Sequence, residues 1–205
     1  MSYKIIVARY NENIDWLNSE FKNCIIYNKG NKLNIDNEIM LDNVGRESDT
    51  YLNYIITNYN NLPDIIVFTQ AKISDHRGSD DVNYLINLKN SAIEYSKSQS
   101  YSTCYGSTKN DWFDKEWNFK DENYYLENNY KDNKPIIFID WFIRYIDNNY
   151  PNPIFIYTNG IFAIKKELIL KRSLDYYKEL INQINHHNDP AEGHFFERSW
   201  YYIFN

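Results

Sequence analysis

Short apolar runs alternate with helical patterns along the first half of the chain. Three runs rich in β-branched residues, Lys4–Ala8, Cys24–Tyr27 and Ile65–Thr69, predict strands that are buried on both faces. Apolar residues at helical spacing predict helices between these strands: a short one that holds Trp16 and Leu17 and follows an N-capping Asn13, one from about Ser48, and one from Asp80. This alternation is typical of an α/β fold with a mostly parallel sheet.

The second half continues the pattern less regularly. Ile136–Ile146 is apolar and fits either a strand or a helix, and a helix from Asp140 is the preferred interpretation. Residues 31–43, 96–108 and 110–131 are expected to be loops. Further elements are expected over the following ranges: strands at Ile154–Tyr157 and Phe162–Ile164, and helices at Lys165–Leu170, Leu174–Ile184 and Glu192–Ile203. We therefore expect one α/β domain over residues 1–205, with a mixed sheet of about six strands flanked by helices.

Composition narrows the class of protein. The chain has 205 residues, which suits a single domain, and 18% aromatic residues, which argues against disorder. Its 30 Asn and 20 Tyr suggest an A/T-rich coding sequence. A net charge of −6 argues against a nucleic-acid partner. With two cysteines, no secretory leader pattern and no apolar run of about 20 residues, we expect a cytoplasmic protein without a membrane span.

Polar residues follow the first predicted strand, where parallel sheets bind ligands beyond the carboxyl ends of their strands. The ring of Tyr10 could stack on a nucleobase, and Arg9 or Asn11 could bond to a base edge or a phosphate. The alternative is a polar loop with a capping Asn. A second loop, Asn43–Glu47, places Arg46 near a helix N-terminus, where it could meet an anion or simply be solvated.

A third polar segment, Ser74–Asp81, follows the third strand. Asp75 with Asp80 or Asp81 could bind Mg²⁺ or Mn²⁺ together with substrate phosphates. For Asp80 and Asp81 the better interpretation is that Asp80 caps the next helix and Asp81 favours its dipole.

The last two segments of interest lie near the C-terminus. Gly160, after Asn159, indicates a close approach of backbone between two strands. On the last helix His194 and Glu197 are three residues apart and could reach one pocket. The alternative is an amphipathic helix with an exposed His194. The motifs GxSxG, HExxH, GxGxxG and GxxxxGK[ST] are absent from the sequence.

Five segments, in order, resemble a small glycosyltransferase-like family of large DNA viruses, fungi and bacteria, above all the compact GT-A-fold domain of chlorella viruses. They read IIVARYNENIDWL, IIYNKG, NVGRESDTYLNYIITNYNNLPDIIVFTQ, NGIFAIKKELILKRSLDYYKEL and FFERSWYYIF. The resemblance spans about residues 4–204, except 31–42 and 96–135. It implies a nucleotide-binding half, residues 1–100, and an acceptor-side half, residues 101–205.

The resemblance also implies site residues for a UDP-sugar donor and Mn²⁺ or Mg²⁺. Arg9, Tyr10, Asn11 and Arg46 would bind the donor, and Asn159 and Gly160 would line the sugar or acceptor side. Asp75, with His194, would be the metal ligands, although Thr69-Gln70-Ala71 stands where the family pattern has DxD. Glu192 or Glu197 would be the catalytic base.

The implied activity is transfer of a sugar from a UDP-sugar to a glycan or glycoprotein acceptor, in a monomer or weak dimer and, for a viral protein, in the host cytoplasm. Two alternatives remain. One is a non-catalytic module that binds a nucleotide-sugar or carbohydrate, and the other is a nucleotidyltransferase or nucleotide-sugar hydrolase on a similar core.

Overall fold

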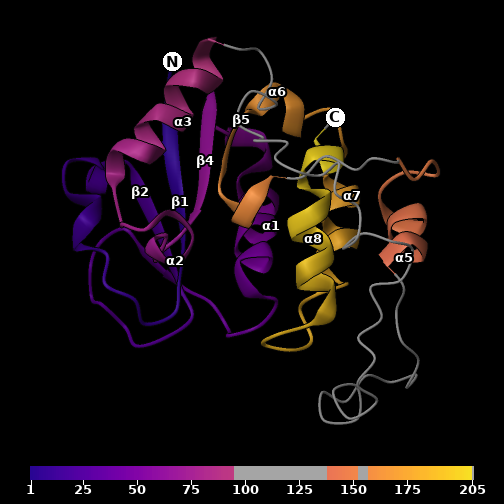
Figure 1. Ribbon diagram of the computed structural model, residues 1–205, viewed down its shortest axis with the longest axis horizontal. Helices are drawn as coiled ribbons and strands as arrows, with labels where there is room; N and C mark the ends of the chain where they lie inside the picture. Colours follow the sequence, from indigo (N-terminus) through magenta and orange to yellow (C-terminus); the bar gives the residue numbers. More distant parts are fainter. Residues whose placement is uncertain (95–137, 152–156, 205) are drawn as a thin grey trace.

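A single five-stranded sheet forms the centre of the protein, whose computed structural model describes residues 1–94, 138–151 and 157–204 (Figure 1). The strand order is β3-β2-β1-β4-β5. Strands β1 to β4 are parallel, and β5 runs antiparallel to β4. The strands span Tyr3–Arg9 (β1), Cys24–Asn28 (β2), Glu38–Met40 (β3), Ile65–Gln70 (β4) and Phe162–Lys165 (β5). The α/β prediction is thus confirmed, with five strands where about six were expected.

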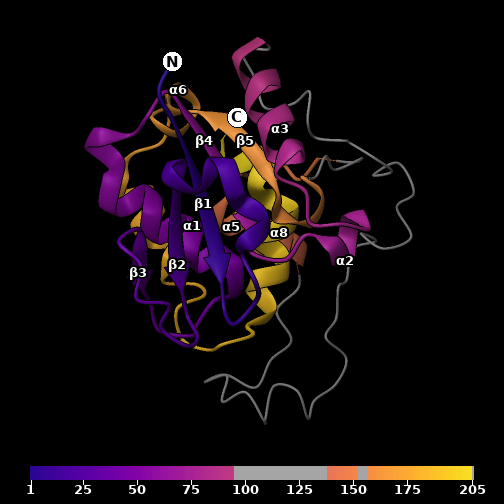
Figure 2. The same cartoon turned by 90° about the vertical axis from the view of Figure 1, so that its left-hand side faces the viewer.

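Helices cover both faces of this sheet (Figures 1 and 2). On one face lie helices α1, α7 and α8, with α5 packed outside α8; on the other lie the 3-10 segment η1 and helix α3. Their bounds are Asp15–Asn23 (η1), Arg46–Asn58 (α1), Ser74–Arg77 (α2), Val82–Glu94 (α3), Phe138–Tyr145 (α5), Lys166–Ile169 (α6), Leu174–Ile181 (α7) and Ala191–Ile203 (α8). Short 3-10 turns at Tyr59–Asn61 (η2) and Thr158–Gly160 (η5) precede β4 and β5.

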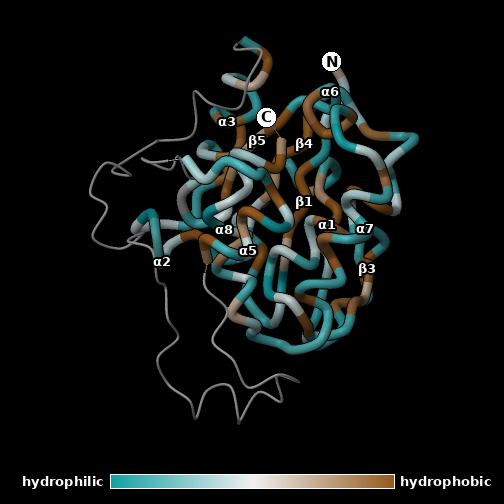
Figure 3. Tube along the Cα trace, turned by 90° about the vertical axis from the view of Figure 1, so that its right-hand side faces the viewer, coloured by the Kyte–Doolittle hydropathy of each residue, from teal (hydrophilic) through white to brown (hydrophobic). Residues whose placement is uncertain are grey.

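Burial on both faces explains the continuous apolar runs of the central strands. In β1, Ile6 faces the layer of α1 and α8, whereas Ile5 and Val7 face η1 and α3. In β4, Phe68 faces the layer of α1 and α8, and Val67 faces η1 and α3. A strand with two buried faces has no polar alternation, which is the signal that predicted β1, β2 and β4. Figure 3 shows hydrophobic segments running through the sheet between polar outer turns.

Aromatic rings fill the core on the α1–α8 side. Tyr51 lies 4.7 Å from Phe68, 5.9 Å from Phe162 and 5.8 Å from Trp200 between ring centroids. The Tyr51 hydroxyl donates to the carbonyl of Gly160 at 2.9 Å. This contact ties α1 to the turn before β5 and so fixes one wall of the site described below.

Strand β3 is a strand that was not predicted from the sequence. It lies within the polar stretch 31–43 and pairs with β2 over three residues at the edge of the sheet. Most of the expected strand Ile154–Tyr157, and the expected loops 96–108 and 110–131, lie outside the described residues. Among the residues that the structure describes, the helices are all too short or too polar to cross a lipid bilayer.

Candidate functional site

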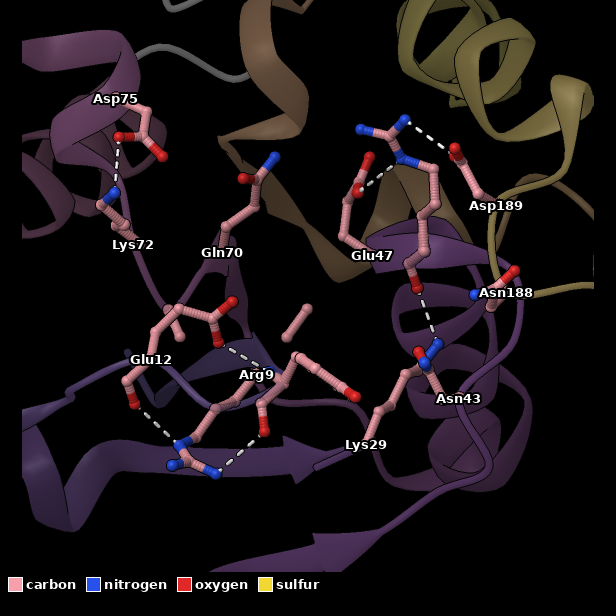
Figure 4. A pocket seen from close by; sticks show the side chains of 14 residues that line it. Arg9, Glu12, Lys29, Asn43, Glu47, Gln70, Lys72, Asp75, Asn188 and Asp189 are labelled. Carbon is pink, nitrogen blue, oxygen red and sulfur yellow. Dashed lines mark hydrogen bonds and ion pairs between the residues drawn. The ribbon is translucent and has the colours of Figure 1, made fainter. Parts of the chain in front are cut away.

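A cleft of about 420 Å³ opens at the carboxyl ends of β1 and β4 (Figure 4). From β1 the chain continues toward β2 on one side, whereas β4 lies on the other side of β1, so the cleft is at the point where the strand order reverses. Open α/β sheets bind ligands at this position. The lining comes from five segments: the end of β1 with its loop, the turn after β2, the start of α1 with the loop before it, the end of β4 with its loop, and the loop before α8. Its residues are Ala8, Arg9, Tyr10, Glu12, Lys29, Asn43, Arg46, Glu47, Gln70, Ala71, Lys72, Asp75, Asn188 and Asp189.

Arg9 lines this cleft but uses its guanidinium to hold the neighbouring loops together. Its Nε donates to the carbonyl of Glu12 at 2.9 Å, and its Nη1 donates to Asn28 Oδ1 at 2.9 Å and to the carbonyl of Asn31 at 3.1 Å. The side chain is buried. Arg9 therefore shapes the loop at one side of the cleft, and its guanidinium is already hydrogen-bonded to protein oxygens.

Tyr10 lines the cleft at the end of β1, whereas Asn11, the next residue, is not among its lining residues. The carboxylate of Glu12 accepts the amides of Tyr10 (2.7 Å) and Asn11 (3.1 Å), and Asn11 Oδ1 accepts the amide of Asn31 at 2.8 Å. Tyr10 is half exposed, at 51%. Its ring is thus held on an ordered loop and is open to a stacking partner.

The backbone that carries Arg46 has an unusual conformation. Gly45 and Arg46 both have positive φ, 63° and 52°, which for a non-glycine residue costs about 1–2 kcal/mol. The ammonium of Lys29 holds this turn by donating to the carbonyls of Val44 and Arg46 and to Asp49 Oδ2 at 2.9 Å. Strained backbone of this kind often occurs at functional sites.

The guanidinium of Arg46 is fixed by groups from α1 and from the start of α8. Its Nη1 lies 3.1 Å from Asp189 Oδ1 and 3.0 Å from His194 Nε2, and its Nε lies 3.7 Å from Glu47 Oε2. A Cβ on Gly193 would lie 2.9 Å from Arg46 Cδ, so only glycine leaves room for this side chain. The side chain remains one-third exposed, at 33%, and lines the cleft.

Glu47 follows Arg46 at the start of α1 and is buried, with 9% exposed. Burial raises the pKa of its carboxyl, with a further upward contribution from Glu197, against the opposing effects of Arg46 and Lys29. The side chain also borders the turn before β5, because a Cβ on Gly160 would lie 3.6 Å from Glu47 Oε1.

Asn159 and Gly160 are the second and third residues of that turn, η5. Both have positive φ, 62° and 63°. Gln70 Nε2, at the end of β4, donates to the carbonyl of Asn159 at 3.0 Å. The two residues therefore contact cleft-lining side chains from β4 and α1, although neither lines the cleft itself among the described residues.

The two expected metal ligands, Asp75 and His194, make other interactions. Asp75 is 60% exposed and pairs with Lys72 at 2.7 Å on the cleft rim. His194 Nε2 faces the Arg46 guanidinium, and burial together with Arg46 and Arg198 lowers the pKa of His194 to about 4. Within the described part of the chain, no three His, Cys, Asp or Glu residues are grouped to hold a metal ion. Asp75 and His194 thus each face a cation, Lys72 and Arg46 respectively.

Asp80 and Asp81 both cap helices, but Asp80 caps a different helix from the one expected. Asp80 Oδ1 accepts the amides of Ile73 and Ser74, both at 2.7 Å, and so caps the preceding helix α2. Asp81 Oδ1 accepts the amide of Asn83 at 2.9 Å at the start of α3. The prediction that Asp80 caps the next helix was wrong, because its carboxylate accepts amides at the start of the short helix α2, which precedes it in the chain.

The two expected base residues, Glu192 and Glu197, both lie on α8. Glu192 is buried in the first turn, with 4% exposed. Glu197 has 27% of its side chain exposed and lies 3.4 Å from Arg198 Nη1. Glu197 is close enough to Arg46 and Glu47 to affect their pKa values, but neither α8 carboxylate lines the cleft among the described residues.

Three residues that line the cleft were not predicted from the sequence to have a role there: Lys29, Glu47 and Asp189. Lys29 follows Asn28 and precedes Gly30 in what reads as a solvated turn, and Glu47 reads as an ordinary acid in the first turn of a helix. One signal was present: Lys29 lies at the carboxyl end of a predicted buried strand, next to the loop that carries Arg9.

Comparison with known families adds one finding. A model of the DUF3431 family, described as proteins of unknown function, matches residues 5–205. The chain belongs to this family. No curated protein and no solved structure matches it. The DUF3431 match covers the sheet from Ile5 in β1 onward and all the residues that line the cleft, so the site is part of the family domain.

Proposed function

We propose that this DUF3431 domain is a GT-A-like glycosyltransferase that moves a sugar from a UDP-sugar to a hydroxyl of a glycan or glycoprotein. The observation that carries the proposal is Arg46, held by Asp189 and His194 on the wall of a cleft at the switch point of the sheet. The resemblance of the chain to small viral glycosyltransferases points to the same class.

The cleft offers a place for each part of such a donor. The exposed ring of Tyr10 is available to stack on uracil at the β1 end. Arg46 and Lys72 are the two cleft cations with exposed charge, since Lys29 and Arg9 are nearly buried. A diphosphate between the β4 loop and α1 would reach both cations. The sugar would then lie toward Glu47 and the η5 turn.

Arg46 would act on the leaving group. As the bond between the anomeric carbon and the phosphate oxygen breaks, negative charge develops on UDP, and a fixed guanidinium stabilises that charge. Asp189 and His194 hold the guanidinium in place before the substrate binds, so it need not reorganise during the reaction.

A divalent ion would add charge stabilisation in many nucleotide-sugar reactions. Because Asp75 pairs with Lys72 and His194 faces Arg46, we assign the residues of this chain no catalytic step through a metal. Asp75→Asn provides the test. If Mn²⁺ strengthens UDP binding to the wild type and not to Asp75→Asn, Asp75 is a metal ligand.

A non-catalytic binding module is the second candidate, favoured by the same exposed Tyr10 ring. Such a module would bind a UDP-sugar or a glycan and release no UDP. A hydrolase would release UDP at a rate that does not increase when a glycan acceptor is added.

The test combines binding and turnover. We expect UDP and at least one UDP-sugar to raise the melting temperature, and an acceptor glycan to increase UDP release. Arg46→Ala should weaken UDP binding about 10- to 100-fold, the loss of one or two charge-assisted hydrogen bonds. Arg144→Ala on the exposed surface of α5 is the matched control and should bind UDP as the wild type does.

Two results would refute the proposal. One is the absence of any thermal shift with UDP-, GDP- or CMP-linked ligands, with and without Mn²⁺. The other is equal UDP affinity in the wild type and in Arg46→Ala.

A further inference from the structure

Five carboxylates lie in or beside the cleft wall, and four of them make hydrogen bonds or ion pairs of 3.1 Å or less. Glu12 accepts the amides of Tyr10 and Asn11. Asp75 pairs with Lys72 at 2.7 Å, and Asp189 accepts from Arg46 at 3.1 Å. Asp49 is buried against Lys29 at 2.9 Å. The fifth is Glu47.

Glu47 differs from these carboxylates in its surroundings. It lines the cleft, yet 9% of it is exposed, so what little surface it has faces the cleft. Its nearest charged partner, Arg46 Nε, lies at 3.7 Å, which is longer than a hydrogen bond. On its other side it borders the η5 turn, where a Cβ on Gly160 would lie in van der Waals contact with Glu47 Oε1, at 3.6 Å.

The groups around Glu47 act on its pKa in opposite directions. Burial and the nearby Glu197 raise the pKa of Glu47, while Arg46, a hydrogen bond from its own backbone amide and Lys29 oppose that rise. Tyr51 faces it from the same helix, and burial with the charges of Glu47 and Glu197 raises the pKa of Tyr51 well above its ordinary value. A base whose pKa is raised toward the working pH is a better proton acceptor than an ordinary Glu.

Glu192 and Glu197, the carboxylates expected from the resemblance, are less suited than Glu47 to accept a proton from a ligand in the cleft. Glu192 is buried in the first turn of α8, and Glu197 is paired with Arg198. Neither is among the described residues that line the cleft. Their effect on the reaction would have to pass through Arg46 or Glu47.

We propose that Glu47 is the catalytic base of the proposed sugar transfer, and this inference rests on that proposed function. The acceptor hydroxyl oxygen forms a bond to the anomeric carbon, and its proton moves to the Glu47 carboxylate. The bond from that carbon to the phosphate oxygen breaks, and its electron pair leaves with UDP. Attack from the face opposite the leaving group means that the sugar is transferred with inversion.

The decisive experiment compares Glu47→Gln with the wild type in transfer from the UDP-sugar that the thermal screen identifies. Loss of a general base lowers kcat about 10²- to 10⁴-fold. The donor KM and UDP affinity should change less than about threefold, because Gln keeps the size of the side chain. The melting temperature should not fall, because a neutral amide replaces a buried carboxyl. Glu167→Gln, on the exposed face of α6, is the matched control and should leave kcat unchanged.

Two further readouts separate a base from a structural residue. Glu47→Ala should regain activity when formate, a small carboxylate, is added, and a positioning role predicts no such rescue. The wild-type kcat/KM should rise with pH through an apparent pKa above that of an ordinary Glu, and Glu47→Gln should lack that limb.

Each negative outcome overturns a different claim. If the wild type binds no UDP-sugar and releases no UDP, the proposed function fails. If the wild type transfers sugar and Glu47→Gln retains at least one-tenth of its kcat, Glu47 is not the base. If Glu197→Gln or Glu192→Gln is inactive while Glu47→Gln is active, the α8 carboxylate is the base instead. Retention of configuration in the product would likewise refute the role given to Glu47.

Discussion

Lys29 Nζ lies 2.9 Å from Asp49 Oδ2, with 6% and 4% of the two side chains exposed. The same ammonium donates to the carbonyls of Val44 and Arg46, and so connects the end of β2 to the turn that presents Arg46. Burial lowers the pKa of Lys29 and raises that of Asp49, so each charge depends on the other to remain ionised.

Removal of Lys29 should therefore be strongly destabilising. Lys29→Met leaves Asp49 as an unpaired buried charge, and we expect a loss of about 3–5 kcal/mol in the free energy of unfolding. The double variant Lys29→Met/Asp49→Leu should recover much of this loss, because it removes both charges. Urea denaturation of the two variants gives the comparison. A single variant that loses less than about 1 kcal/mol would contradict the buried pair.

Gly30 should not tolerate a side chain. A Cβ at this position would lie 1.7 Å from the carbonyl oxygen of Tyr10, which is backbone and cannot move without the β1 loop. We expect Gly30→Ala to cost about 1–3 kcal/mol, as overpacking does, and to weaken UDP binding. Gly78→Ala is the control. Gly78 also has a positive φ, 79°, but nothing lies within 4 Å of its Cβ position, so UDP affinity should be unchanged.

Gly193→Ala should separate stability from binding. Alanine raises helix propensity by up to about 1 kcal/mol relative to glycine, so the melting temperature should stay level or rise. The added methyl group would lie 2.9 Å from Arg46 Cδ and must displace that side chain from the cleft wall. We expect weaker UDP binding in calorimetry despite unchanged stability. Equal affinity in both proteins would show that Arg46 does not bind the ligand.

Stability should depend on His194 at mildly acidic pH. The pKa of His194 is lowered to about 4 in the folded protein from an ordinary value of 6.5, so the unfolded chain takes up a proton first. The stability that neutral His194 contributes is present above pH 6.5 and is lost as the pH falls toward about 4. His194→Gln keeps an acceptor for Arg46 and does not titrate. Its melting temperature should fall less than that of the wild type between pH 6.5 and 4. Parallel curves would contradict this assignment.

The central strands could be predicted from the sequence because burial on both faces leaves an uninterrupted apolar run, as in Ile5, Ile6 and Val7. Strand β3 could not, because it has only three residues and its Ile39 and Met40 are exposed at the edge of the sheet. Helix α2 was missed because four residues between Ile73 and Gly78 carry no periodicity.

Part of the cleft lining could be predicted from the sequence, but the contacts of its side chains could not. The rule for strand ends points to the loops that carry Arg9 and Tyr10, and Arg46 was proposed separately from its place near a helix N-terminus; all three line the cleft. Whether a charged side chain faces ligand or protein depends on neighbours that are distant in sequence. Arg9 meets Asn28 and Asn31, Arg46 meets Asp189 and His194, and neither pairing leaves a local pattern.

Trp16, on η1, gives the cleft an optical reporter. Its indole Nε1 donates to the carbonyl of Ala71 at 2.8 Å, and Ala71 is part of the cleft lining. Trp141 and Trp200 are buried on the opposite face of the sheet. A ligand that moves the β4 loop would change the hydrogen bond of Trp16 and shift its emission. Replacement of Trp16 by Phe would then assign that fluorescence signal to this one indole.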